Sequence, residues 1–193
     1  VFAPANGTTF VDKLTVGASC STEGATIYYT KDGAEPTTGS DKFPTEGVTL
    51  TETTTLKAIA VKDGLDNSEV VTATYTKLEP YASLKALKES GIATEEGKPC
   101  VVELKDAVVT YADSRKAYIQ DETAGLYVFG SNKLKAGTKL NGVVAAQLAL
   151  YFGLYELKVD GGEFDNVAVT NDVEIPVQEV TVAELNQNFA QYE

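Results

Sequence analysis

Apolar and polar residues alternate in several short runs over the first eighty residues. Leu14 to Cys20 places an apolar residue at every second position, and Thr55 to Val61 alternates in the same way. Ala25 to Thr30 and Val70 to Thr76 are rich in residues that favour strands. Lys31-Asp32-Gly33 follows one of these runs, and an Asp-Gly pair is a strong hairpin signal. Short strands at this spacing, with no helical pattern between them, predict an antiparallel β-sandwich.

A boundary between two domains is expected close to Pro80. Proline has no amide hydrogen for a strand ladder, and the pattern of apolar residues changes after this position. Since a common domain holds roughly 100–150 residues, a chain of 193 residues has room for two small ones. We therefore expect domains at residues 1–78 and 79–193.

The second domain is predicted to begin and end with short helical segments. Ala82 to Glu89 has helical spacing and Ser83 is placed to cap it, which predicts a lead-in helix at about residues 82–90. Thr181 and Glu184 fit a capping box and predict a helical C-terminal tail. Between them lie five strand-like runs, at residues 100–111, 116–120, 125–129, 139–151 and 154–159, the first of which is one long strand or a bent pair.

The first domain carries a recognisable signature. Residues 25–37 read Ala-Thr-Ile-Tyr-Tyr-Thr-Lys-Asp-Gly-Ala-Glu-Pro-Thr, which resembles the chitobiase/β-hexosaminidase C-terminal domain. Thr55 to Ala60, Asp63-Gly64 and Tyr75 are similar to later parts of that signature, so the resemblance covers nearly all of residues 1–78. It implies an immunoglobulin-like or fibronectin-type sandwich, an accessory module of secreted bacterial proteins, many of them carbohydrate-active. It implies no catalytic residue.

The second domain resembles OB-fold modules of bacterial extracellular proteins. The residues that carry this resemblance are Ala117 to Asp121, Gly125 to Phe129, Leu134 to Gly137 and Leu150 to Leu157. The first of these segments is a strand that ends in Gln-Asp, and the second is the strand that follows it after a hairpin. The third segment places a Gly before the next strand, and the fourth is a hairpin with aromatic residues around a Gly. Together the two resemblances imply an all-β fold: an immunoglobulin-like β-sandwich followed by a five-stranded OB-type β-barrel with short flanking helices.

The charge of the chain is acidic, −12 at pH 7. The residues up to Pro80 hold 6 basic and 11 acidic side chains, and the remaining residues hold 10 and 17. Nucleic acid is a polyanion bound largely through Lys and Arg, so this composition disfavours it as a partner without excluding it. Arg115 is the only arginine and hence the only possible bidentate clamp for a phosphate or a guanine.

The basic residues that lie near one another in the sequence have two interpretations. They are Arg115, Lys116, Lys133, Lys135 and Lys139. A solvated loop in an acidic protein is favoured over a weak anion-binding patch.

Histidine is absent, which excludes Ser-His-Asp triads, histidine general bases and histidine zinc sites. Asp32 and Glu35 are close enough in sequence for a calcium site, but an Asp-Gly turn explains them better. Asp121 and Glu122 are adjacent, and adjacent strand residues point to opposite faces, so we interpret them as a solvated hairpin turn and not as a glycosidase pair. We expect no catalytic residue, no metal and no cofactor.

The two cysteines, Cys20 and Cys100, allow a disulfide or two unrelated buried thiols. Both lie in strand-like runs, and free cysteine is among the most buried residue types, which favours the second interpretation.

Aromatic residues give the best indication of a ligand site. An OB barrel binds oligonucleotides or oligosaccharides on the face of its second and third strands and in neighbouring loops. In those strands aliphatic residues alternate with aromatic and polar ones, so the latter face outward if the former fill the barrel. They can then stack on sugar rings or bases, or instead pack against the lead-in helix or the other domain. The candidate ligand-binding residues are Tyr118, Gln120, Tyr127, Phe129, Tyr151 and Phe152.

We therefore expect a non-enzymatic accessory or binding segment of a secreted or surface-anchored bacterial protein, located in the extracellular space, in the periplasm or on the cell surface. The first-choice partner is a polysaccharide or cell-surface glycan bound by the barrel. The alternatives are single-stranded nucleic acid at the barrel, or a purely structural spacer that positions a catalytic domain absent from this chain. No apolar run approaches the roughly 20 residues of a membrane helix, and we expect a monomer.

Overall fold

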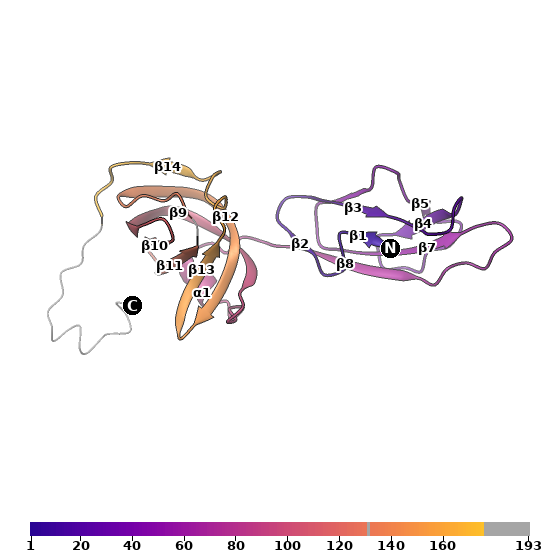
Figure 1. The fold of residues 1–193 in the computed structure, drawn as a ribbon, viewed down its shortest axis with the longest axis horizontal. Coiled ribbons are helices and arrows are strands. Elements are labelled where there is room, and N and C mark those ends of the chain that lie inside the picture. Colours follow the sequence, from indigo (N-terminus) through magenta and orange to yellow (C-terminus); the bar gives the residue numbers. More distant parts are fainter. Residues whose placement is uncertain (131, 176–193) are drawn as a thin grey trace. The chain divides into compact units, whose positions relative to one another are not determined.

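Figure 1 shows the computed structural model of the chain, which describes residues 1–130 and 132–175. The fold is all-β, as the sequence predicts. It divides into two compact units, Val1–Glu79 and Pro80–Glu193. Each unit has its own buried hydrophobic core. The helical tail predicted from Thr181 lies outside the described residues.

The first unit is a sandwich of two sheets. One sheet has the order β1 (Phe2–Ala3), β3 (Leu14–Ala18), β6 (Val48–Leu50). The other has the order β2 (Thr9–Phe10), β8 (Val71–Lys77), β7 (Thr54–Val61), β4 (Thr26–Thr30), β5 (Asp41–Lys42). All neighbouring strands are antiparallel except β2 and β8. This is the β-sandwich that the alternation predicts, and it agrees with the immunoglobulin-like form that the resemblance implies.

The core of the sandwich contains side chains from both sheets. Val16 from one sheet, and Leu56 and Tyr75 from the other, are fully buried. The Tyr75 hydroxyl donates a hydrogen bond to the Pro4 carbonyl oxygen at 2.8 Å, so its polar end is satisfied inside the core.

Two predictions for this unit were wrong. Lys31-Asp32-Gly33 does not form a tight hairpin, because ten residues, 31–40, connect β4 to β5. The Asp32 carboxylate accepts the amide of Ala34 at 3.0 Å and Gly33 has φ +76°, so the Asp-Gly pair makes a local turn inside that longer loop. Cys20 is exposed, because β3 ends at Ala18 and the chain has already left the sheet.

The second unit is a closed five-stranded barrel. The order around it is β9 (Lys98–Ala112), β10 (Lys116–Gln120), β11 (Gly125–Gly130), β13 (Leu154–Val159), β12 (Thr138–Tyr151) and back to β9. The β11–β13 pair is parallel and the others are antiparallel. A short strand, β14 (Ala168–Thr170), adds to β12. This arrangement is consistent with the expected OB-type module.

Strand β9 is long enough to pair with both β10 and β12, and it changes register at a bulge. Asp106 has φ +50° there and lies between the pairs Ala107–Leu140 and Leu104–Gly142, so that Lys105 and Asp106 oppose the single residue Asn141. The Asn141 side chain accepts the Asp106 amide at 2.9 Å and donates to its carboxylate at 3.2 Å. The first bond satisfies the backbone amide of Asp106 at the bulge, and the second holds the two side chains together.

A short helix, α1 (Leu84–Lys88), contributes Leu84 and Leu87 to the barrel core. Ser83 caps it, as predicted, by accepting the amide of Ala86. A helix of five residues has no independent stability, so it depends on this packing.

Asp121, in the β10–β11 hairpin, holds the helix to the barrel. It is only 7% exposed, and its carboxylate accepts the amides of Leu84, Thr123 and Ala124 at 2.7–2.9 Å and the Thr123 hydroxyl at 2.6 Å. The solvated turn expected at this position was therefore wrong. Burial acts to raise the pKa of Asp121, but the hydrogen bonds outweigh it and the pKa is lowered.

Replacing Asp121 by Asn is expected to destabilise the second unit by about 2 kcal/mol at pH 7, because an amide cannot accept all four bonds. The pKa of Asp121 is lower in the folded protein than in the unfolded chain. The ionised carboxylate therefore stabilises the fold above its unfolded-state pKa, and this stabilisation is lost as the pH falls through the folded-state pKa. The difference between D121N and wild type should therefore shrink below about pH 4. Hydrogen exchange of peptides from β9 measures this difference in stability. Glu122→Gln, a change at an exposed neighbour, is the control. Equal destabilisation at pH 7 and pH 3 would contradict the account.

Replacing Gly130 by Ala tests the closure of the barrel. Gly130 has φ +123°, and a Cβ there would lie 1.9 Å from the Val159 carbonyl oxygen of β13. We expect about 3 kcal/mol of destabilisation, from strain and separation of β11 from β13. Gly125→Ala is the matched control, because its Cβ would meet no atom closer than 3.9 Å. Hydrogen exchange of β13 peptides should rise in G130A only, and unchanged exchange in G130A would be the contrary result.

Candidate functional site

Four aromatic side chains form a row across the outer face of β9, β10 and β11. The ring centroids of Tyr111 and Tyr118 are 6.3 Å apart, those of Tyr118 and Tyr127 are 5.1 Å apart, and those of Tyr127 and Phe129 are 6.3 Å apart. We call Tyr111, Tyr118, Tyr127 and Phe129 the aromatic row.

The register of the strands explains why the rings meet. Tyr118 lies directly opposite Tyr111 on one side and Tyr127 on the other, and directly opposed residues share a face of the sheet. The alternate positions hold aliphatic side chains that are buried in the barrel: Ala117, Ile119, Leu126 and Val128. Because the core takes every second residue, the aromatic residues between them must point outward.

Members of the row differ in exposure. Tyr111 is 50% exposed and Tyr118 is 47% exposed, whereas Tyr127 is 8% exposed between its neighbours. Burial, and then the negative charge of Glu156 on β13, raise the pKa of Tyr127. The hydroxyl of Tyr127 therefore stays protonated at neutral pH. Tyr127 forms the base of the row, and Tyr111 and Tyr118 offer ring faces to a ligand.

The turn between β9 and β10 borders the row. The Asp113 carboxylate accepts the amides of Arg115 and Lys116 at 2.8 and 2.7 Å and the Tyr111 hydroxyl at 3.2 Å. The amide of Arg115 holds the pKa of this carboxyl below its usual value, and the amide of Lys116 also lowers it. The Arg115 guanidinium lies over the ring of Phe129, 5.8 Å from its centroid.

The structure brings together only some of the residues expected from the sequence. Tyr118, Tyr127 and Phe129 are neighbours in the row, and Gln120 is exposed two residues further along β10, on the same face. Tyr151 and Phe152 form a separate edge-to-face pair, with centroids 4.6 Å apart, at the β12–β13 hairpin. Among the described residues neither of these two rings contacts an aromatic ring of the row.

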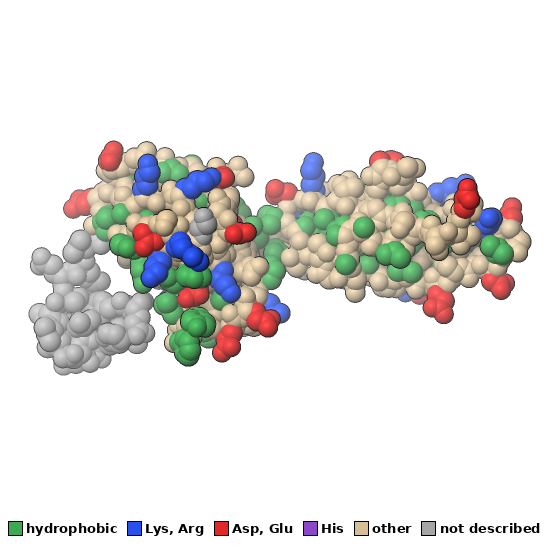
Figure 2. Space-filling model, in the orientation of Figure 1, with side chains coloured by type: hydrophobic (Ala, Val, Ile, Leu, Met, Phe, Trp, Pro, Cys, Tyr) green, Lys and Arg blue, Asp and Glu red, His purple; other side chains and the backbone are tan. Residues whose placement is uncertain are grey.

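Phe152 has an unusual backbone conformation for a large residue. It has φ +49° and is followed by Gly153 with φ +87°, which gives a two-residue hairpin of the type that favours Asn-Gly. Its side chain is 92% exposed at the tip. In Figure 2, hydrophobic side chains gather in a protruding group at the lower edge of the second unit.

Sequence reasoning missed Tyr111 and Arg115 as parts of the site. Tyr111 could have been found by extending the inward-outward alternation from β10 to its partner strand β9. The change of register between Tyr118 and Ile119 interrupts that alternation, and the sequence does not reveal it. Arg115 was noted as the only possible bidentate clamp and as a member of a basic stretch, but not as a neighbour of the aromatic residues.

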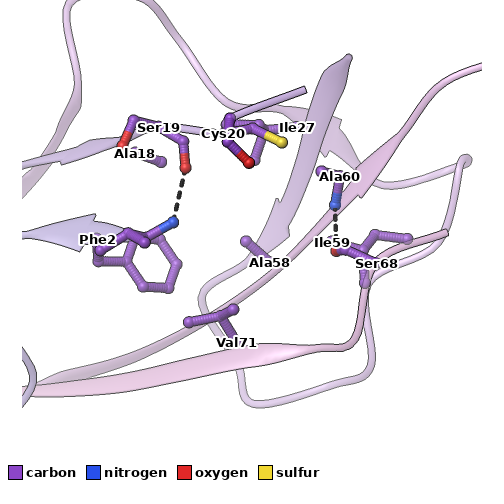
Figure 3. A pocket seen from close by; sticks show the side chains of 12 residues that line it. Phe2, Ala18, Ser19, Cys20, Ile27, Ala58, Ile59, Ala60, Ser68 and Val71 are labelled. Atoms are coloured by element: carbon purple, nitrogen blue, oxygen red, sulfur yellow. Dashed lines mark hydrogen bonds between the residues drawn. The ribbon is translucent and has the colours of Figure 1, made fainter. Parts of the chain in front are cut away.

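The first unit has an apolar pocket of about 410 Å³ at the ends of its strands (Figure 3). Phe2, Ile27, Ala58 and Val71 contribute to its walls, and Cys20 lies at its rim. No charged side chain lines it, and its polar groups include Ser68, whose hydroxyl oxygen accepts the amide of Ala60 at 2.8 Å. Nothing in it is arranged for acid, base or metal chemistry.

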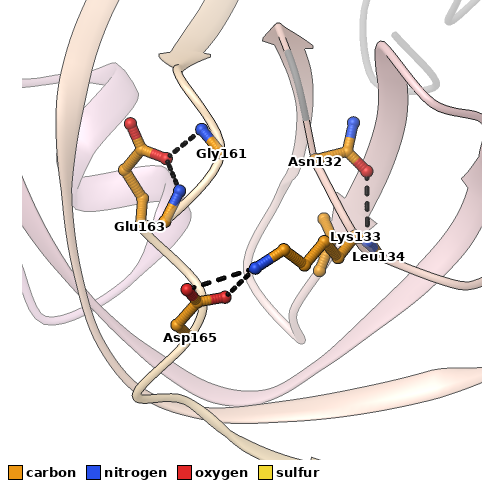
Figure 4. Close-up of polar contacts among 7 residues, drawn as sticks. Asn132, Lys133, Leu134, Gly161, Glu163 and Asp165 are labelled. Atoms are coloured by element: carbon orange, nitrogen blue, oxygen red, sulfur yellow. Dashed lines mark hydrogen bonds and ion pairs between the residues drawn. The ribbon is translucent and has the colours of Figure 1, made fainter.

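A smaller pocket of about 230 Å³ lies beside the loop between β13 and β14. Figure 4 shows the polar contacts around this loop. Its charged groups are paired: Lys133 contacts the Asp165 carboxylate at 3.0 Å. The neighbouring Glu163 accepts the amides of Asp160, Gly161 and Gly162 at 2.7–2.9 Å. These contacts shape the loop. Within residues 1–130 and 132–175, no group of three or more acidic or cysteine side chains gathers as a metal site.

Comparison with known proteins identifies the first unit alone. Residues 4–72 match the family described as Chitobiase/beta-hexosaminidase C-terminal domain, an immunoglobulin-like accessory domain without catalytic function. Domains of this type usually occur in extracellular glycosidases. No curated protein and no solved structure matches the chain. In the described part of the chain, no helix has the length and apolar character needed to cross a membrane.

The aromatic row lies entirely outside the matched segment. The function of the barrel must therefore be argued from its own geometry.

The environments of the two thiols predict different reactivity. Both cysteines are free; Cys20 is exposed, whereas Cys100 is buried among the barrel strands. Burial raises the pKa of Cys100 to about 11, which further suppresses its reactive thiolate. Ellman's reagent should therefore titrate one thiol in the native protein and two after denaturation. A native protein with no reactive thiol, or with two, would contradict the assignment.

Proposed function

We propose that this chain is a non-enzymatic accessory segment of a secreted bacterial protein and that it binds a polysaccharide through the aromatic row. The observation that carries the proposal is the continuous row of partly exposed rings on the outer face of the second and third barrel strands. This is the face on which OB barrels hold oligosaccharides and oligonucleotides.

The chemistry of the row suits a sugar chain. The C–H groups of a pyranose ring form an apolar face that packs against an aromatic ring, while its hydroxyl groups need hydrogen-bond partners at the edges. Tyr111 and Tyr118 supply exposed ring faces, and Gln120 supplies an exposed amide at one end. Because the rings are fixed by strand pairing, a ligand does not have to order them on binding, which lowers the entropic cost of binding.

Charge favours a sugar chain over nucleic acid. The residues after Pro80 carry 10 basic and 17 acidic side chains, a net charge of −7. Figure 2 shows acidic and basic side chains interspersed on the visible face of the second unit. Among the described residues on that face, the basic side chains form no continuous surface. A single strand of DNA or RNA carries one phosphate per nucleotide and needs several cations along its path.

The sandwich fits the role of a scaffold for the barrel. Its match is to an accessory domain that usually occurs in extracellular glycosidases, which supports a location outside the cytoplasm. In such proteins a binding module raises the concentration of substrate near a catalytic domain on the same chain.

Affinity electrophoresis tests the proposal. We expect at least one of xylan, laminarin, hydroxyethyl cellulose, pectin and alginate to retard the protein. Tyr118→Ala should weaken this binding by about 10-fold or more, since one aromatic stacking partner contributes about 1–3 kcal/mol. Tyr151→Ala is the matched control, because Tyr151 is a tyrosine of similar exposure, 53%, outside the row.

Three results would contradict the proposal. One is no retardation by any of the five polysaccharides. Another is a loss of retardation in Tyr151→Ala but not in Tyr118→Ala, which would move the site to the β12–β13 hairpin. The third is a salt-dependent shift with an oligothymidylate that exceeds any response to polysaccharide, which would favour the nucleic-acid alternative.

A further inference from the structure

We infer that the aromatic row ends in a subsite for one carboxylate of an acidic sugar, formed by Arg115. The inference rests on the proposed function and adds a ligand class to it: a polysaccharide that contains uronic acid residues. It is carried by the position of the only arginine in the chain, over the ring of Phe129 at the end of the row.

The main chain of Arg115 is fixed on two sides. Its amide donates to the Asp113 carboxylate at 2.8 Å, and its carbonyl oxygen accepts the amide of Gly130 at 2.9 Å. The guanidinium is then supported by the Phe129 ring, 5.8 Å from its centroid. A guanidinium held over a ring keeps N–H groups at its edge available, and their fork matches the two oxygens of a carboxylate.

The side chain of Arg115 is exposed and, among the described residues, makes no ion pair and no hydrogen bond. Three lysines of the same unit have acidic partners: Lys105 pairs with Glu103, Lys133 with Asp165 and Lys139 with Asp106. Arg115 thus differs from them in having an aromatic support in place of a carboxylate.

The charges around this end of the row limit the number of anionic groups that fit. Lys116 lies opposite Phe129 on the neighbouring strand and therefore shares its face. Asp113 is the one acidic neighbour in the turn, and its oxygens already accept the amides of Arg115 and Lys116 and the Tyr111 hydroxyl. Lys158 lies opposite Phe129 on β13, and its ammonium donates to the Glu96 carbonyl oxygen at 3.1 Å. Arg115 and Lys116 against Asp113 leave a net charge of about +1 at the turn itself.

The remainder of the row repels further negative charge. Glu156 lies opposite Tyr127 on β13, close enough to raise the pKa of that tyrosine. A nucleic acid strand would place a second and third phosphate along such a path. A sugar chain with an uncharged ring on Tyr118 and a single carboxylate at Arg115 meets no such repulsion, so the geometry favours it.

Matched pairs of polysaccharides test the subsite. Glucuronoxylan, pectin and alginate are each compared with their carboxyl-reduced forms by affinity electrophoresis of the full chain at about 0.15 M salt, where long-range charge effects are screened. We expect at least one acidic form to bind about 10-fold more tightly than its reduced form, as one charge-assisted bidentate contact implies. Arg115→Gln should abolish that preference and still bind the reduced form.

Two further variants sharpen the test. Arg115→Lys keeps the charge but not the fork, so it should recover only part of the preference. Lys135→Gln removes an exposed cation with no contact to the row and should leave the preference unchanged. Circular dichroism of each variant should match that of wild type, because both side chains are exposed.

The outcomes separate this inference from the proposed function. If neutral or reduced polysaccharides bind in a Tyr118-dependent way and no acidic form is preferred, the carboxylate subsite is wrong and the glycan site stands. If an acidic form is preferred but Arg115→Gln keeps that preference, the carboxylate subsite is again wrong and the glycan site stands. If no polysaccharide binds, both are wrong. Binding of an oligothymidylate that depends on Arg115 and exceeds that of every acidic polysaccharide would reassign the subsite to phosphate.

Discussion

The second unit depends on one constraint, the period of two along a β-strand in a barrel that closes on itself. Closure buries one face of every strand, so the inward positions of β10 and β11 must be aliphatic. The positions between them then lie on one continuous outer surface, and the pairing register fixes which side chains become neighbours. The aromatic row is a consequence of this closure together with the choice of tyrosine and phenylalanine at the outward positions.

Other features of the barrel maintain that closure. Gly130 permits the close approach of β11 to Val159 on β13, where no Cβ would fit. The register of β9 with β12 changes at the Asp106 bulge, where the Asn141 side chain accepts the Asp106 amide. Asp121 attaches α1 to the β10–β11 hairpin, and the helix in turn contributes Leu84 and Leu87 to the core. Each of these residues acts on the row indirectly, by keeping its strands in register.

Much of the fold was predictable because it follows from local patterns. The Ser83 cap, the β10–β11 hairpin and the break before β13 are encoded within a few neighbouring residues. The long loop after β4 and the burial of Asp121 were not predictable, because each depends on partners distant in sequence; the exposure of Cys20 was missed because β3 ends at Ala18, two residues before the alternation does. For Asp121 the deciding bond comes from Leu84, 37 residues away.

The candidate site was predictable in part for the same reason. Alternation along β10 and β11 indicates that Tyr118, Tyr127 and Phe129 share the outer face. It does not indicate that Tyr111 joins them across a change of register, or that Arg115 lies over Phe129. Nor does it separate Tyr151 and Phe152 from the row, since that separation depends on where the β12–β13 hairpin ends.

The most direct test of the account is a map of amide chemical shifts in the labelled protein during titration with a soluble polysaccharide that retards it. The account predicts that the shifts concentrate at Tyr111, Arg115, Tyr118, Tyr127 and Phe129. Shifts confined to the β12–β13 hairpin around Phe152, or to the apolar pocket of the first unit, would contradict it.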